Sequence, residues 1–210
     1  MGFPIPDLPE LLGGRLCLDF VNTVHHRFRD ASRDYLEDYP SWLGWSVHAG
    51  ALSADEAARL GATASTEPRL AARAFDRALA FRGTAHSILL QRMTDSDPEP
   101  ALVGELNELL ALAAPLRVLK PGEQGEWSWS WREGAIDLGR PLFAVAVSFA
   151  ELLEAAPPDR VKQCPAPDGC GWFFLDQTKN GSRRWCSMNH CGTTSKARRY
   201  LRKKRQVDAH

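Results

Sequence analysis

The sequence has no long hydrophobic run. No stretch among its 210 residues approaches the roughly 18 uninterrupted apolar residues that a membrane-spanning helix needs. Its first 15 residues also lack the basic patch followed by an apolar run that marks a secretory signal. We therefore expect a cytoplasmic protein with no membrane partner. The hydrophobic content of 44% is sufficient for a buried core.

The common catalytic motifs are missing as well. The sequence contains no glycine-rich phosphate loop, no H-E-x-x-H zinc motif, and no arrangement of serine or cysteine with histidine that would indicate a nucleophile. We therefore expect that the protein is not an enzyme. An enzyme whose helical part binds a metabolite is the least favoured function.

The sequence carries no net charge, because 26 basic residues balance 26 acidic ones. The charges are nevertheless unevenly distributed. Residues 160–210 hold 12 Lys and Arg against 3 Asp and Glu, whereas residues 1–159 hold 14 against 23. The two parts therefore carry +9 and −9. This asymmetry indicates an attached module with an anionic partner. Nucleic acid is favoured as that partner over an anionic membrane surface.

The larger, acidic part has the pattern of a mainly helical domain. Apolar spacing predicts helices within 13–27, from Ser53 onward, and over 68–93, 98–114 and 141–156. Ser53 and Glu56 have the spacing of a capping box, and Asp97 is expected to cap the helix that follows it. Prolines at 157–158 end the last helix, which places a domain boundary there.

One segment of this part alternates tryptophan with serine instead of following a helical period. The sequence W-S-W-S-W at 127–131 predicts a strand, and the turn that follows predicts a hairpin with residues 135–139. The three indoles share one face of this strand. They would either pack on the helices as core, which is the favoured interpretation, or line an aromatic ligand pocket.

Four of the five cysteines lie within 28 residues, in the pattern C-x5-C-x15-C-x4-C. Clustered thiols in a reducing compartment are more typical of metal ligands than of disulfides. Four thiolates suit tetrahedral Zn²⁺ and leave no open position for a catalytic water. The predicted zinc ligands are Cys164, Cys170, Cys186 and Cys191. Thiols that merely pack together, or His190 in place of one thiol, are the alternatives.

The spacing also predicts how the zinc site is built. Turn residues at 165–169 would fold the first cysteine pair, and residues 171–176 predict a strand in a hairpin between the two pairs. Five residues of helix rotate by about 500°, so Cys186 and Cys191 cannot face one point from a regular helix. Cys186 is expected before a helix and Cys191 in its first turn. Zinc binding contributes ~10–16 kcal/mol to the folding of small modules, so it would then anchor the basic run at 196–205.

This basic segment has the charge that nucleic-acid binding requires. Residues 183–205 hold nine cations, and a helix fits the major groove of double-stranded DNA. The alternatives are an RNA-binding or acidic-protein-binding module and a solvated charged face. The residues predicted to contact DNA are Arg183, Arg184, Lys196, Arg198, Arg199, Arg202, Lys203 and Arg205.

Two motifs resemble a known family. The sequence C-G-W-F-F-L-D-Q-T-K-N-G-S-R-R-W-C-S-M-N-H-C-G at 170–192, followed by S-K-A-R-R-Y-L-R-K-K-R, resembles the CGNR zinc finger, a treble-clef-like module. The sequence G-G-R-L-C-L-D-F-V-N-T-V at 13–24 resembles the start of the ABATE domain, which precedes that finger in bacterial proteins classed as stress-induced transcription regulators. The resemblance spans essentially the whole chain.

The resemblance implies an α+β fold in two domains. Residues 1–156 would form a mainly helical ABATE-like domain with a small β-hairpin, and residues 160–210 a treble-clef-like zinc finger with a basic C-terminal helix. It places the family's zinc ligands on the four cysteines named above. Thr193 and Thr194 stand where the family has asparagine and arginine, so a contact made by that arginine is lost here.

Three polar residues interrupt the apolar N-terminal motif. Asp19, Asn22 and Thr23 would either bind a small-molecule effector or form a buried hydrogen-bonded network. The combined prediction is a transcription regulator whose N-terminal domain senses a ligand or mediates assembly. A homodimer is an open alternative, because DNA-reading helices commonly act in pairs, although no heptad seam indicates how the chain would pair.

Overall fold

The computed structural model describes residues 8–25, 33–94, 96–134, 137–165 and 170–207. The α+β class is confirmed, because helices dominate and the strands of the described segments form small antiparallel hairpins. The α-helices are α1 (Leu16–Val21), α2 (Tyr39–His48), α3 (Ala54–Thr66), α4 (Pro68–Met93), α5 (Pro100–Ala113), α6 (Arg140–Ala155) and α7 (Thr193–Val207). Within the described segments, no helix is long and apolar enough to cross a membrane.

The first helix is shorter than its apolar stripe predicted. α1 ends at Val21, and Val24 lies instead in the short strand β1 (Val24–His25), which pairs with β2 (Arg33–Asp34). Asn22, the C-cap of the helix, and Thr23 use their side chains for contacts with Phe173 and Arg82. The apolar spacing of the sequence alone does not indicate where this helix ends.

Helix starts were predicted with mixed success. The capping box at α3 is confirmed, since Ser53 accepts from the Glu56 amide and Glu56 accepts from the Ser53 amide. The predicted cap at Asp97 is wrong, because α5 begins at Pro100 after Glu99, without a side-chain cap. Proline is favoured in the first helical turn, where its missing N–H costs no hydrogen bond.

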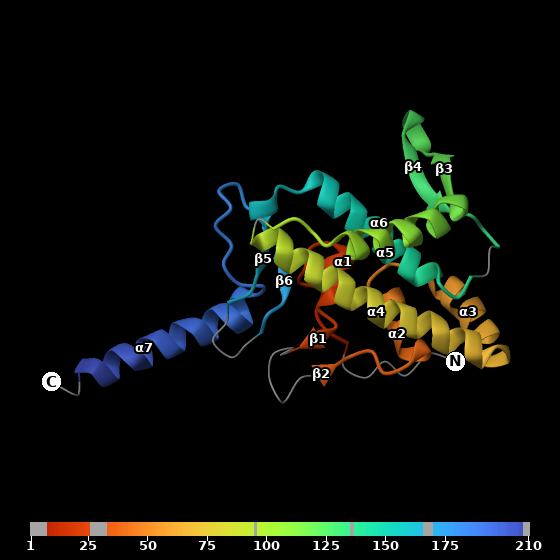
Figure 1. Ribbon diagram of the computed structural model, residues 1–210. Helices are drawn as coiled ribbons and strands as arrows, with labels where there is room; N and C mark the ends of the chain where they lie inside the picture. The colour runs from red at the N-terminus through yellow and green to blue at the C-terminus, as the bar shows by residue number, and fades with distance from the viewer. Residues whose placement is uncertain (1–7, 26–32, 95, 135–136, 166–169, 208–210) are drawn as a thin grey trace.

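The tryptophan strand pairs with a different partner from the one predicted. β4 (Trp127–Trp131) pairs with the upstream strand β3 (Arg117–Pro121), not with residues 135–139, of which 135–136 lie outside the described residues. The core interpretation is also wrong for two of the three indoles, since Trp127 and Trp129 are 65% and 61% exposed. The hairpin stands away from the helices in Figure 1, so most of its apolar face meets no helix. Trp131, at its base, does pack against the core.

One hydrophobic core connects the helices and extends into the C-terminal segment. Aromatic side chains from different helices meet in it, such as Phe20 with Trp45 and Phe81 with Phe149. Phe173 and Leu175, from beyond the predicted domain boundary, are buried in the same cluster. The C-terminal segment is therefore packed on the N-terminal part through shared apolar side chains.

The C-terminal segment holds two short strands and the last helix. β5 (Val161–Gln163) pairs antiparallel with β6 (Phe173–Leu175), so the hairpin encloses the first cysteine pair. The prediction had placed this hairpin between the two pairs, and that placement is wrong. α7 extends away from the rest of the molecule toward the C-terminus (Figure 1).

Candidate metal centre and its basic helix

Each cysteine is positioned by a different piece of local structure. Cys164 directly follows β5, and its amide donates to the Trp172 carbonyl at 2.8 Å, which brings the two sides of the first pair together. Cys170 precedes β6, while most of the predicted turn between this pair lies outside the described residues. As predicted, Cys186 precedes the last helix. Cys191 lies in a wide π-helical turn, Met188–Gly192, that leads into α7.

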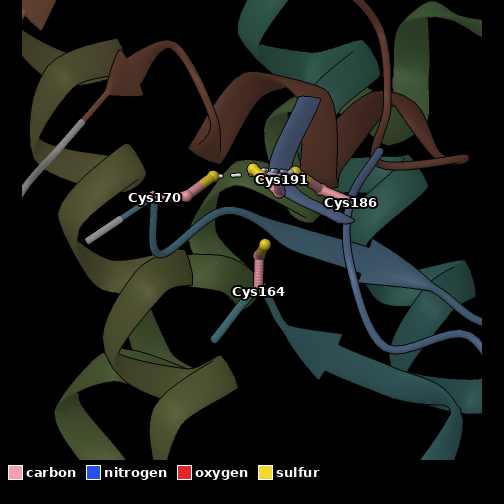
Figure 2. Close-up of side chains that lie close together, drawn as sticks. All are labelled: Cys164, Cys170, Cys186 and Cys191. Atoms are coloured by element: carbon pink, nitrogen blue, oxygen red, sulfur yellow. Dashed lines mark hydrogen bonds between the residues drawn. The ribbon is translucent and has the colours of Figure 1, made fainter. Parts of the chain in front are cut away.

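The four sulfur atoms converge on one point, as Figure 2 shows. All lie within 4.8 Å of one another, and the Sγ–Sγ distances are 3.6 Å for both Cys170–Cys186 and Cys186–Cys191. Tetrahedral zinc with Zn–S bonds of about 2.3 Å would place its sulfurs ~3.8 Å apart. The thiols are free rather than paired in disulfides, so the donor set fits zinc in both chemistry and spacing.

The environment of the thiols favours the neutral form when no cation is bound. All four are buried, together with Trp172 and Phe174. Hydrogen bonding with Cys164 raises the pKa of Cys170 and of Cys186, and burial raises the pKa of Cys191. A bound cation reverses this preference, because thiolates are the metal-binding form. A bound divalent cation would therefore stabilise the four buried cysteines as thiolates and offset part of their negative charge.

A buried carboxylate braces the loop between the two cysteine pairs. Asp176 accepts from the Lys162 ammonium at 2.7 Å, from Thr178, and from the Arg183 amide at 2.9 Å. Burial disfavours its charge, yet these donors hold the pKa of Asp176 well below its usual range. No motif in the sequence singled out Asp176. Its only signal was an acidic residue at the end of an apolar strand within a basic segment.

Asn22 joins the N-terminal part to the finger. Its side-chain amide donates to the Phe173 carbonyl, and its oxygen accepts from the Phe173 amide, both at 2.8 Å. This pair of hydrogen bonds imitates the pairing of a neighbouring strand on the open edge of β6. The Leu175 amide donates to the Gly13 carbonyl at 2.8 Å on the same edge.

Asp19 and Thr23 are buried beside this junction. Asp19 accepts from the Gly13 amide at 2.7 Å, and burial raises its pKa to about 6. The Thr23 hydroxyl donates to the Phe20 carbonyl and accepts from the Arg82 guanidinium at 2.8 Å. Each of the three polar residues of the N-terminal motif is thus buried with hydrogen-bond partners of its own, and their role in effector binding stays a prediction.

The predicted DNA-contacting residues fall into two groups. On α7, the side chains of Lys196, Arg198, Arg199 and Arg202 are exposed, as is Arg184 before the helix. The side chains of Lys203 and Arg205 lie outside what the structure describes. Tyr200 is 68% exposed on the same helix. Arg184 lies over the Trp185 ring at 5.3 Å, and the four cations on α7 present their charge to solvent.

Arg183 differs from the other predicted DNA contacts. Its guanidinium donates to the carbonyls of Leu12 and Cys186, at 2.9 and 2.6 Å, and lies over the Phe174 ring at 4.5 Å. These contacts connect the loop before α7 to the N-terminal segment. The side chain serves the internal structure of the finger, so we do not assign it to the DNA surface.

The remaining residues near the cluster do not add ligands. His190 is 65% exposed on its side chain and lies 3.4 Å from Glu10. It is not part of the group of four described side chains that could hold one metal ion, so the geometry favours the four cysteines over His190. Thr193 donates its hydroxyl to the Met188 carbonyl at 3.0 Å, which closes the turn before α7.

Comparisons with known families agree with this geometry. Residues 160–204 match the CGNR zinc finger, and residues 14–156 match the ABATE family, described as "Putative stress-induced transcription regulator". A comparison with curated proteins gave no match. The chain belongs to the ABATE family and carries a CGNR zinc finger at its C-terminal side. It is a zinc-binding protein of a regulatory family, and its four clustered cysteines could hold one metal ion.

Proposed function

We propose that the protein is a transcription regulator that binds double-stranded DNA through α7. The observation that carries this proposal is a helix with its cations exposed, which directly follows a buried cluster of four cysteines. Cys164, Cys170, Cys186 and Cys191 are the proposed zinc ligands. Zinc fixes the direction in which α7 leaves the molecule, and the exposed cations contact phosphates and base edges.

The charge distribution supports this assignment. The N-terminal part is acidic and would be repelled by DNA, whereas α7 extends away from it (Figure 1). Because the basic helix is separated from the acidic part, the helix can enter a groove of the DNA while the acidic N-terminal surface stays in solvent. The N-terminal domain, residues 1–156, would then sense a signal or mediate assembly.

A salt series with matched variants tests the proposal. Fluorescence anisotropy would measure binding of the zinc-loaded chain to pooled random duplex DNA. Binding should weaken steeply with salt, with a log–log slope of about −0.9 per phosphate contacted. The triple change Arg198→Ala, Arg199→Ala and Arg202→Ala should weaken binding at least tenfold.

The control variant removes the same charge elsewhere. Arg69, Arg73 and Arg77 are exposed on α4, and their combined change to alanine should leave DNA affinity within about twofold of the wild type. Equal losses in both variants would show that only net charge matters and would contradict a DNA surface on α7. Preference for single-stranded RNA over duplex DNA would favour an RNA-binding module instead.

A further inference from the structure

A cavity in the N-terminal part contains a buried arginine that is short of partners. The cavity has a volume of about 540 Å³, within the range of about 300–1,000 Å³ that small-molecule sites occupy. Its lining comes from the first turn of α3, the end of β4 and the first turn of α6, and it includes no cysteine. Arg140, Trp131, Leu116 and Glu56 are the lining residues that matter for its chemistry.

Arg140 is poorly compensated for a buried cation. The residue is 7% exposed, and its Nε and Nη1 atoms have no hydrogen-bond partner among the described residues. Its Nη2 atom reaches only Glu56 Oε1, at 3.4 Å. Burial lowers the pKa of Arg140 to about 10, which reflects the cost of keeping this charge away from water. A buried guanidinium with five donors normally meets more acceptors than this.

The helix that carries Arg140 adds to the positive potential. Arg140 is the first residue of α6, a helix of 16 residues whose N-cap, Gly139, makes no side-chain hydrogen bond. The first turn of α6 holds no acidic residue. The N-terminal end of a helix carries partial positive charge, so a cation there is unfavourable and an anion is favourable.

Four carboxylates line the cavity; three of them bind other groups, and the fourth, Asp55, is exposed in the first turn of α3. Glu56 accepts from the Ser53 amide and hydroxyl through Oε2 as part of the α3 cap. Asp137 accepts from the Gly139 amide at 2.8 Å, and Glu133 pairs with Lys120. They therefore leave Arg140 undercompensated. The lining also holds Arg59 and Arg132, so four carboxylates face three guanidiniums. This near balance disfavours a dianion more than a monoanion, so a monoanion fits the cavity best.

The apolar side of the cavity is aromatic. The Arg140 guanidinium lies over the Trp131 ring at 3.8 Å, and Leu116 lines the cavity beside it. This arrangement holds the guanidinium plane fixed, as bidentate pairing with a carboxylate requires. Trp131 and Leu116 offer a surface for the apolar part of a bound molecule.

We propose that this cavity binds a small organic monocarboxylate, with its carboxylate on Arg140 and its apolar body against Trp131 and Leu116. The site specifies the sensing role proposed above for the N-terminal domain, and that role rests on the proposed function. Carboxylate binding itself requires no DNA, so it is tested separately from DNA binding.

Isothermal titration calorimetry of the zinc-loaded full chain without DNA tests the proposal. The probes are acetate, isovalerate, benzoate and indole-3-acetate, with benzyl alcohol and inorganic phosphate as comparisons. At least one carboxylate with an apolar body should bind saturably and at least tenfold more tightly than acetate, benzyl alcohol or phosphate. Absence of saturable binding by all four carboxylates, or tighter binding of phosphate, would overturn the proposal.

Variants assign the binding to the cavity. Arg140→Gln should weaken the best carboxylate at least tenfold, whereas Arg77→Gln, on exposed α4 surface, should leave it unchanged. Trp131→Leu keeps the Arg140 guanidinium but removes the aromatic ring, so it should weaken the binding of benzoate more than the binding of acetate. Circular dichroism would confirm that each variant is folded. Unchanged affinity in folded Arg140→Gln, or an equal loss in Arg77→Gln, would refute the assignment.

Discussion

Asn22 shows how one side chain can join two parts of this molecule. It satisfies both backbone groups of Phe173, and both residues are buried. Each polar group left unsatisfied in such a place costs about 1–3 kcal/mol. The stability of the finger's docking therefore depends on a residue that lies in the N-terminal motif.

Asn22→Ala should lower the free energy of unfolding by about 3 kcal/mol, because the Phe173 amide and carbonyl lose their partners. Urea denaturation of the zinc-loaded protein measures this change. The matched control is Asn107→Ala on the exposed side of α5, which should change stability by less than about 0.5 kcal/mol. Similar small effects in both variants would contradict the role of Asn22 as a structural clamp.

Asp19 offers a test based on pH. Its pKa is raised to about 6 by burial, above the value of about 3.9 expected in the unfolded chain. The unfolded state then binds fewer protons between these values, so Asp19 lowers stability as the pH rises from about 4 to 6, and the full penalty remains above that range.

Asp19→Asn keeps an oxygen that can accept from the Gly13 amide and removes the buried charge. It should stabilise the protein by about 2 kcal/mol at pH 8 and by about 1 kcal/mol at pH 5. Urea denaturation at the two pH values measures the difference. If the variant gains the same stability at both pH values, or loses stability at pH 8, the charge of Asp19 is not disfavoured by its surroundings.

At the scale of elements, an exposed tryptophan of the β3–β4 hairpin can be compared with a buried tryptophan of α2. Trp129→Ser should cost less than about 1 kcal/mol, because its ring is 61% exposed and touches mainly Arg117. Trp45→Ala, in the fully buried part of α2, should cost about 3–5 kcal/mol. Thermal unfolding of both variants gives the comparison. A loss at Trp129 that matches the loss at Trp45 would mean that the hairpin face is covered.

Some elements could be predicted from the sequence because their signals are local. The α3 capping box and the bend between Cys186 and Cys191 depend on residues within five positions of each other. The partner of β4 could not be predicted in this way, because W-S-W-S-W has candidate strands on both sides. The pairing is decided by residues 122–126, where Gly125 adopts a φ of +83° and the Gly122 amide donates to the Glu126 carbonyl at 2.7 Å.

Long-range contacts account for the rest of what the sequence did not reveal. The clustering of the four cysteines was predictable because four cysteines in two pairs are rare and their chemistry is specific. Asp176 and Arg183 were not recognised as structural residues, since several of their partners are backbone groups whose position depends on the folded chain. α2 was also missed, because its N-terminus is closed by Asp38 and Ser41 rather than by a Glu at the third position.

At the scale of the whole molecule, zinc and the N-terminal core should be coupled. Phe173 and Leu175 belong to the core cluster, and they lie between two of the cysteines in the sequence. Cys186→Ser should therefore lose zinc and lower the unfolding midpoint of the entire chain. Cys17→Ser, at the fifth cysteine in the helical core, should keep one equivalent of zinc. Metal analysis and urea denaturation distinguish the two variants, and retention of zinc by Cys186→Ser would refute the ligand assignment.

The central claim is that zinc holds α7 in the position needed to bind DNA. The most direct measurement is the affinity of the full chain for duplex DNA with zinc bound, after chelation, and after zinc is restored, at constant salt. The account predicts loss of binding by at least tenfold on chelation and recovery with one equivalent of zinc. Equal affinity with and without zinc would show that the basic segment binds DNA without the metal centre, and the central claim would be wrong.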